Sequence, residues 1–314
     1  MRVSVLSAIG NTPVHELRGF DAPSRARIIL KLELANPTGS MKDRMALAMI
    51  DGAERAGRLR PGGDIVEFTG GSTGTSLAFI AAARGYRLTI ITSDAFSLEK
   101  RRHMAAFGAD VRLVASDGGR ITPDLFVRMK AEVDAIAVER GAFWTDQFNN
   151  HDQAGGYDAL AEEAWEQSGG AIDALVQAVG TAGSLRGTAT GLRRHHPSVE
   201  VVAVEPSTSA VMSGGAPGPH RMEGMGTGRL VPLFSPDLIT GVEAVSTEDA
   251  EAMARRLARE EGVFAGTSTG ANLVAALRVA RRLGPGRTVL TLAVDDGLKY
   301  VTTPLYAAGA GPRA

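Results

Sequence analysis

Two kinds of apolar pattern alternate along the chain. Short apolar runs bounded by turn residues, as at 64–68 and 88–92, are typical of buried strands. Longer segments with helical periodicity, as at 123–140 and 247–261, predict helices. We expect further strands at 28–34, 111–115, 174–179, 201–205 and 288–294, and further helices at 97–107, 156–167 and 272–283. This alternation predicts an α/β fold with mostly parallel sheets and helices on both faces.

The alternation also predicts how the chain is divided. Strands and helices between residues 37 and 145 form one small doubly wound lobe, and the same pattern resumes from 146 to the end. At 314 residues the chain exceeds one typical domain. A ligand is expected between the lobes, at the carboxyl ends of the strands.

Lys42 lies at a strand-to-helix corner, in the stretch Asn-Pro-Thr-Gly-Ser-Met-Lys-Asp-Arg at 36–44. The turn residues end the strand, Ser40 is a candidate helix cap, and the helix continues from Met41. A helix N-terminus disfavours a cation, so an amine there is easier to keep deprotonated. A deprotonated amine attacks an aldehyde to form a Schiff base. The alternative is an ordinary solvated lysine on a polar helix face.

Two glycine-rich turns each follow a strand and precede a helix. One is Thr-Gly-Gly-Ser-Thr-Gly at 69–74, before a helix at 75–83; the other is Gly-Thr-Ala-Gly-Ser at 180–184, before a helix at 185–194. This arrangement directs backbone N–H groups and a helix dipole at an anion. One such turn is explained equally well by close helix–strand packing. Two of them beside a lysine corner favour a cofactor that carries a phosphate.

Composition excludes several other classes of function. The net charge is −1 and the basic residues are scattered, so a nucleic-acid surface is not expected. The chain has no cysteine, and its six histidines show no metal-binding spacing, so neither disulfides nor a metal site is expected. No apolar run approaches the roughly 20 residues of a membrane span, and no signal-peptide pattern is present. We therefore expect a cytoplasmic protein that does not contact membranes.

Several motifs in a fixed order resemble those of one enzyme family. Residues 10–14 (GNTPV) are similar to the opening GNTPL of the cysteine synthase family, and 36–44 to its NPTGSxKDR. Residues 204–206, 220–228 and 262–271 (GVFAGTSTGA) resemble later landmarks, so the resemblance covers nearly the whole chain. It implies the tryptophan-synthase-β-like fold of pyridoxal-phosphate enzymes (fold type II), with two doubly wound lobes. Residues 1–36 would join 146–314 in the large lobe, with pyridoxal 5′-phosphate between the lobes.

The resemblance also implies roles for individual residues. Lys42 would be the Schiff-base lysine, and would then take the α-proton of the substrate. The phosphate would lie in the turn Gly180, Thr181, Ala182, Gly183 and Ser184. Ser268 matches the serine that bonds the pyridine nitrogen, where a neutral hydroxyl suits elimination and replacement at the β-carbon. Its alternative role is a helix N-cap, and the two roles can coexist.

The turn at 69–74 departs from the family pattern. It aligns with the loop that holds the substrate carboxylate, which reads TSGNT in the family, but here it is Thr69, Gly70, Gly71, Ser72 and Thr73. Ser72 replaces an asparagine that contacts the phenolic oxygen of the cofactor and the substrate, and Gly70 replaces a serine. Gln147 matches a family glutamine on the same carboxylate; its alternative is a loop amide that bonds backbone groups. The departure puts the substrate in doubt, not the cofactor.

The resemblance predicts β-replacement on an activated serine such as O-acetylserine, with sulfide or another small nucleophile, through an α-aminoacrylate. It also implies a homodimer. A β-elimination lyase or dehydratase of the same fold, such as a serine dehydratase or cysteine desulfhydrase, is an alternative. A catalytically weak regulatory or partner-binding homologue is another.

Overall fold

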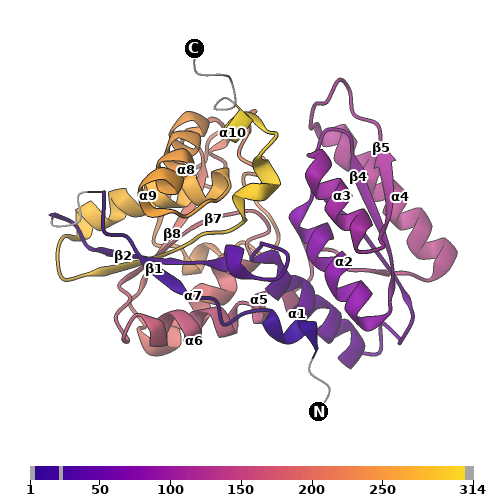
Figure 1. The fold of residues 1–314 in the computed structure, drawn as a ribbon, viewed down its shortest axis with the longest axis horizontal. Helices are drawn as coiled ribbons and strands as arrows, with labels where there is room; N and C mark the ends of the chain where they lie inside the picture. Colours follow the sequence, from indigo (N-terminus) through magenta and orange to yellow (C-terminus); the bar gives the residue numbers. More distant parts are fainter. Residues whose placement is uncertain (1–3, 21–23, 308–314) are drawn as a thin grey trace.

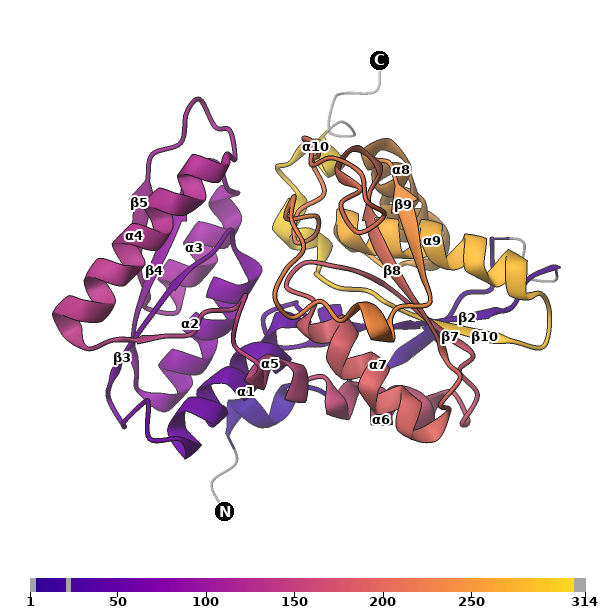
Figure 2. The same ribbon diagram turned by 180° about the vertical axis from the view of Figure 1, so that it is seen from behind.

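Two separate sheets organise the chain. The computed structural model describes residues 4–20 and 24–307. One sheet has four parallel strands in the order β5-β4-β3-β6: β3 Asp64–Phe68, β4 Arg87–Ser93, β5 Asp110–Val114 and β6 Phe143–Trp144. The other has six strands in the order β1-β2-β10-β7-β8-β9: β1 Val14–Glu16, β2 Arg27–Lys31, β7 Ala174–Ala178, β8 Glu200–Pro206, β9 Gly241–Val245 and β10 Thr288–Leu292. Only β1 runs antiparallel to its neighbour. The two sheets lie side by side (Figures 1 and 2).

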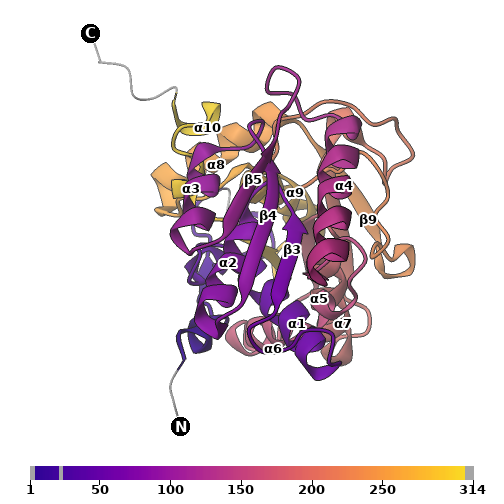
Figure 3. The same cartoon turned by 90° about the vertical axis from the view of Figure 1, so that its right-hand side faces the viewer.

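Helices cover both faces of the smaller sheet. Figure 3 shows α4 on one face and α2 and α3 on the other. Val66 and Ile91 pack toward α4, whereas Ile65 and Ile90 pack toward α1 and α2, because successive strand residues point to opposite faces. The helices are α1 Lys42–Arg55, α2 Ser72–Arg84, α3 Leu98–Ala106, α4 Pro123–Arg140, α5 Asp152–Gly155, α6 Asp158–Gln167, α7 Gly183–His195, α8 Thr247–Glu261, α9 Thr267–Leu283 and α10 Pro304–Ala307. No helix in the described ranges is long and apolar enough to cross a membrane.

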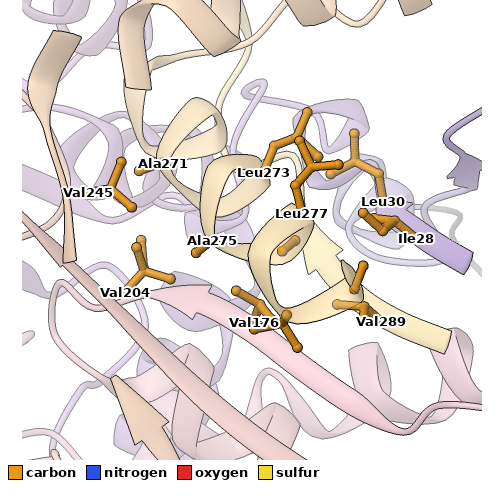
Figure 4. Packing of buried hydrophobic residues seen from close by; sticks show 14 of the residues in the cluster. Ile28, Leu30, Val176, Val204, Val245, Ala271, Leu273, Ala275, Leu277 and Val289 are labelled. Carbon is orange, nitrogen blue, oxygen red and sulfur yellow. The ribbon is translucent and has the colours of Figure 1, made fainter. Parts of the chain in front are cut away.

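The larger sheet is buried on both faces too. Figure 4 shows α9 packed on the strands, with Leu273 and Leu277 facing Ile28, Leu30 and Val289. A second cluster, on the other face, places α6 and α7 against the same strands. Strands covered on both sides read as continuous apolar runs, which is why the sequence predicts them well. The predicted α/β class with mostly parallel sheets is confirmed.

Some element boundaries differ from the prediction. The strand expected at 28–34 ends at Lys31, and a short 3-10 helix, Glu33–Ala35, follows it. Helix α9 begins at Thr267 rather than 272, because its first turn is formed by small polar residues that carry no apolar period. The strands β1 and β9 lie at the sheet edges, have few fully buried residues and were not predicted. The division into lobes at residues 37 and 145 stays a prediction.

Candidate active site

Loops at the carboxyl ends of the parallel strands meet between the two sheets. The residues after β10 bridge to Ser40, just before α1, and to Ala265, just before α9. The turn after β3 joins the same place through Ser72, whose hydroxyl donates to Asp295. The predicted lysine corner, the glycine-rich turn at 69–74 and the Ser268 helix start are therefore brought together.

Lys42 is the first residue of α1 and only 8% exposed. Ser40 accepts a hydrogen bond from the Lys42 backbone N–H at 3.1 Å and donates to Asp295 Oδ1 at 2.6 Å. The N-cap is Met41 and not Ser40 as predicted; Ser40 supports the helix start from the position before the cap. Burial lowers the pKa of the Lys42 amine, and the Asp295 carboxylate offsets part of this effect. A buried amine with a lowered pKa can serve as a nucleophile and a base.

Asp295 is a buried carboxylate that the sequence analysis missed. It accepts hydrogen bonds from Ser40, from Ser72 at 2.5 Å and from the Tyr300 hydroxyl at 3.1 Å. Burial raises its pKa, but Lys299, Lys100 and the hydroxyl donors outweigh this and leave the pKa below its ordinary value. Its position directly after the apolar run at 288–294 was the available signal, because that run ends at the same edge as the other parallel strands.

The turn at 69–74, called here the β3 turn, leads into the N-terminus of α2. Thr69 Oγ1 accepts from the Gly71 N–H at 3.1 Å, and Thr73 Oγ1 donates to Gln147 Oε1 at 2.8 Å. The Gln147 amide in turn donates to the Phe68 carbonyl at 3.0 Å. Gln147 thus bonds a backbone carbonyl, as the alternative prediction states. It also lies next to the turn that is predicted to hold the substrate carboxylate. The first-turn N–H groups of α2, beside Thr73 and Gln147, are of the kind that bind an anion at a helix N-terminus.

The unusual glycines of the β3 turn have a steric cause. A Cβ on Gly70 would lie 2.8 Å from the Phe96 ring, and a Cβ on Gly71 would overlap the Lys100 side chain. Gly71 also has a φ of 153°, which side chains rarely adopt. Gly70, where the family has serine, therefore leaves room for the Phe96 ring. The sequence alone does not indicate this contact.

The turn at 180–184, called here the β7 turn, leads into α7. Ala182 has a φ of 68°, and a Cβ on Gly180 would overlap the Gly224 carbonyl. Thr181 donates to Gln153 Oε1 at 2.7 Å, and Ser184 accepts from Gln177. These conformations turn the chain sharply from β7 into α7, so the backbone N–H groups at the start of α7 converge on the space above the turn.

A phosphate group fits the β7 turn. The first turn of α7 carries no acidic residue, so its positive end is not neutralised. Ser184 accepts from the Gln177 amide, so its own hydroxyl proton can be donated to a phosphate oxygen. Gln153, which sequence reasoning missed, joins the turn to the other half of the site, because its Nε2 donates to the Gln147 carbonyl at 2.5 Å.

Ser268 lies in the first turn of α9, whose N-cap is Gly266, so the alternative of Ser268 as the N-cap is wrong. The residue is buried, and within the described ranges its hydroxyl has no hydrogen-bond partner. The Gly266 N–H donates to the Asp295 carbonyl at 3.1 Å, which ties this helix start to the lysine corner. A buried hydroxyl at this helix start, next to the lysine corner, is suited to bind a ligand nitrogen.

One ion pair closes the site between the two sheets. Lys100 of α3 pairs with Glu223, and its ammonium lies 4.5 Å from the centroid of the Tyr300 ring. The segment around Glu223 also packs on the β7 turn, since Gly226 donates to the Val179 carbonyl at 3.0 Å. Sequence reasoning missed this pair, because its members are far apart in the chain.

Comparisons with known proteins agree with this geometry. A family model described as pyridoxal-phosphate dependent enzyme matches residues 5–295. The cysteine synthases of Staphylococcus aureus strains Mu50 and N315 are each 39% identical over 310 residues, covering 97% of this chain and of the relative.

Solved structures agree as well. An O-ureido-L-serine synthase has a TM-score of 0.90 and 33% identity, covering 100% of this chain and 98% of that chain. An O-acetyl serine sulfhydrylase from Entamoeba histolytica has a TM-score of 0.89 and 35% identity, covering 98% and 92%. A hydrogen sulfide-producing enzyme from Fusobacterium nucleatum has a TM-score of 0.85 and 32% identity, covering 96% and 100%.

Proposed function

The chain belongs to the family of pyridoxal-phosphate dependent enzymes, and on that premise we propose that it catalyses β-replacement on an activated serine. The observation that carries the proposal is Lys42, a buried amine of lowered pKa at the start of α1, next to the Asp295 carboxylate that Ser72 of α2 also bonds. O-acetylserine or a close analogue would be the substrate, and sulfide or another small nucleophile would replace its leaving group. The relatives named as cysteine synthase and O-acetyl serine sulfhydrylase support this choice.

Each part of the site has one task in this proposal. Pyridoxal phosphate, when bound, supplies an electron sink for negative charge at the α-carbon. Lys42 would hold its aldehyde, residues 180–184 its phosphate and Ser268 its ring nitrogen. Residues 69–73 and Gln147 would hold the carboxylate of the amino acid.

Lys42 would also move the proton. Once the amino group of the substrate replaces Lys42 on the aldehyde carbon, the freed neutral amine would take the α-proton; the bond from the β-carbon to oxygen would then break, and acetate would leave with the electron pair. A sulfide sulfur then bonds to the β-carbon, and Lys42 returns its proton to the α-carbon. The lowered pKa of the amine favours the neutral form that this first transfer needs.

A second candidate is β-elimination on the same site. The similarity to a hydrogen sulfide-producing enzyme favours it, and so does the β3 turn, where Ser72 bonds Asp295. If this turn does not retain the unsaturated product that remains after the leaving group departs, that product, α-aminoacrylate, is released, and water hydrolyses it to pyruvate and ammonia. A homodimer is proposed on the family resemblance, and a cytoplasmic location stays the expectation drawn from the sequence.

Product analysis tests the proposal. The yellow holoenzyme is mixed with O-acetylserine with and without sulfide, and acetate, cysteine and pyruvate are measured. We expect acetate and cysteine in equal amounts when sulfide is present, and little pyruvate without it. Pyruvate formed at the same rate in both mixtures would favour elimination. Release of no acetate in either mixture would contradict both functions.

A further inference from the structure

Glu67 is a carboxylate inside the smaller sheet with no role in the proposed chemistry. It lies in β3 and is fully buried. Its oxygens accept four hydrogen bonds, from the N–H groups of Phe68 at 2.9 Å and Gln147 at 3.1 Å, from Trp144 Nε1 at 3.3 Å and from the Thr145 hydroxyl. No ion pair with Glu67 is found in the described part of the chain. A charge buried in this way is costly unless hydrogen bonds compensate for it.

The donors to Glu67 share one segment of the chain. Three of them belong to residues 144–147, which continue from β6 toward α5. Asp146 in this segment has a φ of 45°, a conformation that an aspartate tolerates but does not favour. The hydrogen bonds to Glu67 therefore stabilise a backbone conformation of residues 144–147 that the φ preference of Asp146 does not favour.

The segment that Glu67 holds carries Gln147. With its N–H on Glu67, Gln147 places its Nε2 on the Phe68 carbonyl and its Oε1 on the Thr73 hydroxyl. Its carbonyl accepts from Gln153, which also bonds Thr181. One buried carboxylate thus supports a side chain at the N-terminus of α2 and, through Gln153, contacts the β7 turn.

We infer that Glu67 is the positioning residue of the amino-acid carboxylate site, acting through Gln147. This inference rests on the proposed function, in which the α2 N-terminus, Thr73 and Gln147 bind the substrate carboxylate. A group held in place before the ligand arrives loses little conformational freedom on binding, so the affinity is higher. Without Glu67, the Gln147 segment has to be ordered each time a substrate binds.

The carboxylate chemistry of Glu67 suits this task better than an amide. An ionised carboxylate is acceptor-only and offers about four lone-pair sites, which matches four donors. A glutamine of nearly the same shape has one acceptor oxygen and directs an NH₂ group at other donors. Glu67→Gln therefore preserves volume and removes the hydrogen-bond pattern.

The test compares Glu67→Gln with wild type as holoenzymes. We expect the KM for O-acetylserine, and its apparent Kd from the visible absorbance of the cofactor, to rise about 10- to 100-fold, as for a buried group left unpaired. The cofactor affinity and the KM for sulfide should stay within about twofold, because neither ligand contacts Gln147 in the proposed site. A loss confined to kcat or thermal stability, with unchanged KM and Kd for the amino acid, would overturn the inference.

A double-mutant cycle separates positioning from general structural support. If Glu67 acts through Gln147, then Glu67→Gln combined with Gln147→Ala should have the same KM as Gln147→Ala alone. Additive effects would overturn the inference. If Glu67→Gln does not fold, Thr145→Val takes its place, since it removes one donor to Glu67 and keeps the carboxylate; a smaller rise in KM is then expected, and no rise would count against the inference.

Failure of the proposed function gives a different result. If wild type releases no acetate from O-acetylserine, the proposed reaction is wrong. The Glu67 comparison is then made with O-phosphoserine and cysteine, followed by cofactor absorbance, because the α-carboxylate is common to all these ligands. Equal affinity of wild type and Glu67→Gln for every ligand that binds would refute the positioning role.

Discussion

The β3 turn and the β7 turn have the same strand–glycine–helix plan but different surroundings. In the β3 turn, Ser72 bonds the Asp295 carboxylate and Thr73 bonds Gln147, which Glu67 holds. In the β7 turn, the hydroxyls of residues 181 and 184 bond only the neutral amides of Gln153 and Gln177. One turn is thus surrounded by ionisable groups and the other by amides.

This difference indicates which ligand each turn suits. A phosphate carries nearly two negative charges, and a buried carboxylate beside it is strongly unfavourable. Asp295, which bonds Ser72, therefore argues against phosphate at the β3 turn, whereas Thr181 and Ser184 bond neutral amides. The β3 turn suits an amino-acid carboxylate, whose single charge is balanced by the substrate ammonium. Changes in the two turns and in their partners can break or sharpen this assignment.

Lys42→Ala removes the proposed reacting amine, whose cofactor and substrate the two turns would bind. It has the largest expected effect on activity. We expect kcat to fall by about 10⁴ or more, because covalent attachment and proton transfer are both lost. The β7 turn should still bind the cofactor without a covalent bond. Borohydride reduction followed by mass spectrometry should attach the cofactor to Lys42 in wild type and to no residue in the variant. Lys130→Ala, a change on exposed α4, is the control. Covalent attachment in the Lys42 variant would refute the assignment.

Gly183→Ala tests the β7 turn alone. Its Cβ would overlap the Gln153 side chain and displace it from Thr181. We expect a loss of about 1–3 kcal/mol in cofactor binding, or about 10- to 100-fold in Kd, as for overpacking at a close contact. Gly155→Ala has open space around its Cβ and is the control. Unchanged cofactor affinity would place the phosphate elsewhere.

Restoring the family pattern tests the β3 turn. Gly70→Ser with Ser72→Asn alone should destabilise the protein, because the Gly70 Cβ would lie 2.8 Å from the Phe96 ring. With Phe96→Ala added, we expect kcat/KM for O-acetylserine to rise about tenfold, since an amide gained at position 72 pairs a polar group of that substrate. Steady-state rates with sulfide measure this. If wild type is as fast as the triple variant, the departure from the family loop has no effect on specificity.

Titration of Glu67 should change the affinity for the amino acid at the β3 turn and leave the affinity for the cofactor at the β7 turn unchanged. Burial raises the pKa of Glu67 to about 7, partly offset by its hydrogen-bond donors. The protonated form loses acceptors for Gln147, so the KM for the amino acid should rise a few-fold as pH falls below about 7. Cofactor affinity should not follow this titration, because the partners of the β7 turn are amides.

The free energy of unfolding should depend on pH in the opposite sense to substrate binding: low pH weakens binding but stabilises the fold. The folded protein holds the Glu67 proton more tightly than the unfolded chain, so this group lowers stability as pH rises from about 4.5 to about 7, by at most about 3 kcal/mol. Glu67→Gln removes this difference. Charged groups near the segment are Lys130, over the Trp144 ring at 4.9 Å, and Arg58, over the Phe143 ring at 5.2 Å. Denaturant unfolding of wild type and Glu67→Gln at pH 5 and 7.5 measures the effect. If the two proteins differ in free energy of unfolding by the same amount at both pH values, the prediction is contradicted.

The sequence was sufficient for the parts of the fold and site that depend on local order. The predicted strand at 64–68 and the helices at 123–140 and 247–261 match β3, α4 and α8, because each has a clear apolar period. Lys42 and both glycine-rich turns were located from local turn chemistry. Asp295, Glu67 and Gln153 were missed, since their partners lie far away in the chain and only the sheet topology brings them together.

One pair of matched variants tests most directly the claim that the two turns bind different ligands. Thr73→Val and Thr181→Val each replace a buried hydroxyl by a methyl group of the same size. Cofactor Kd and amino-acid KM are measured for both on the same preparations. We predict that Thr73→Val raises the KM for O-acetylserine about tenfold and leaves cofactor Kd unchanged, whereas Thr181→Val does the reverse. If both variants change the two constants in the same way, the turns do not have separate ligands and the account is wrong.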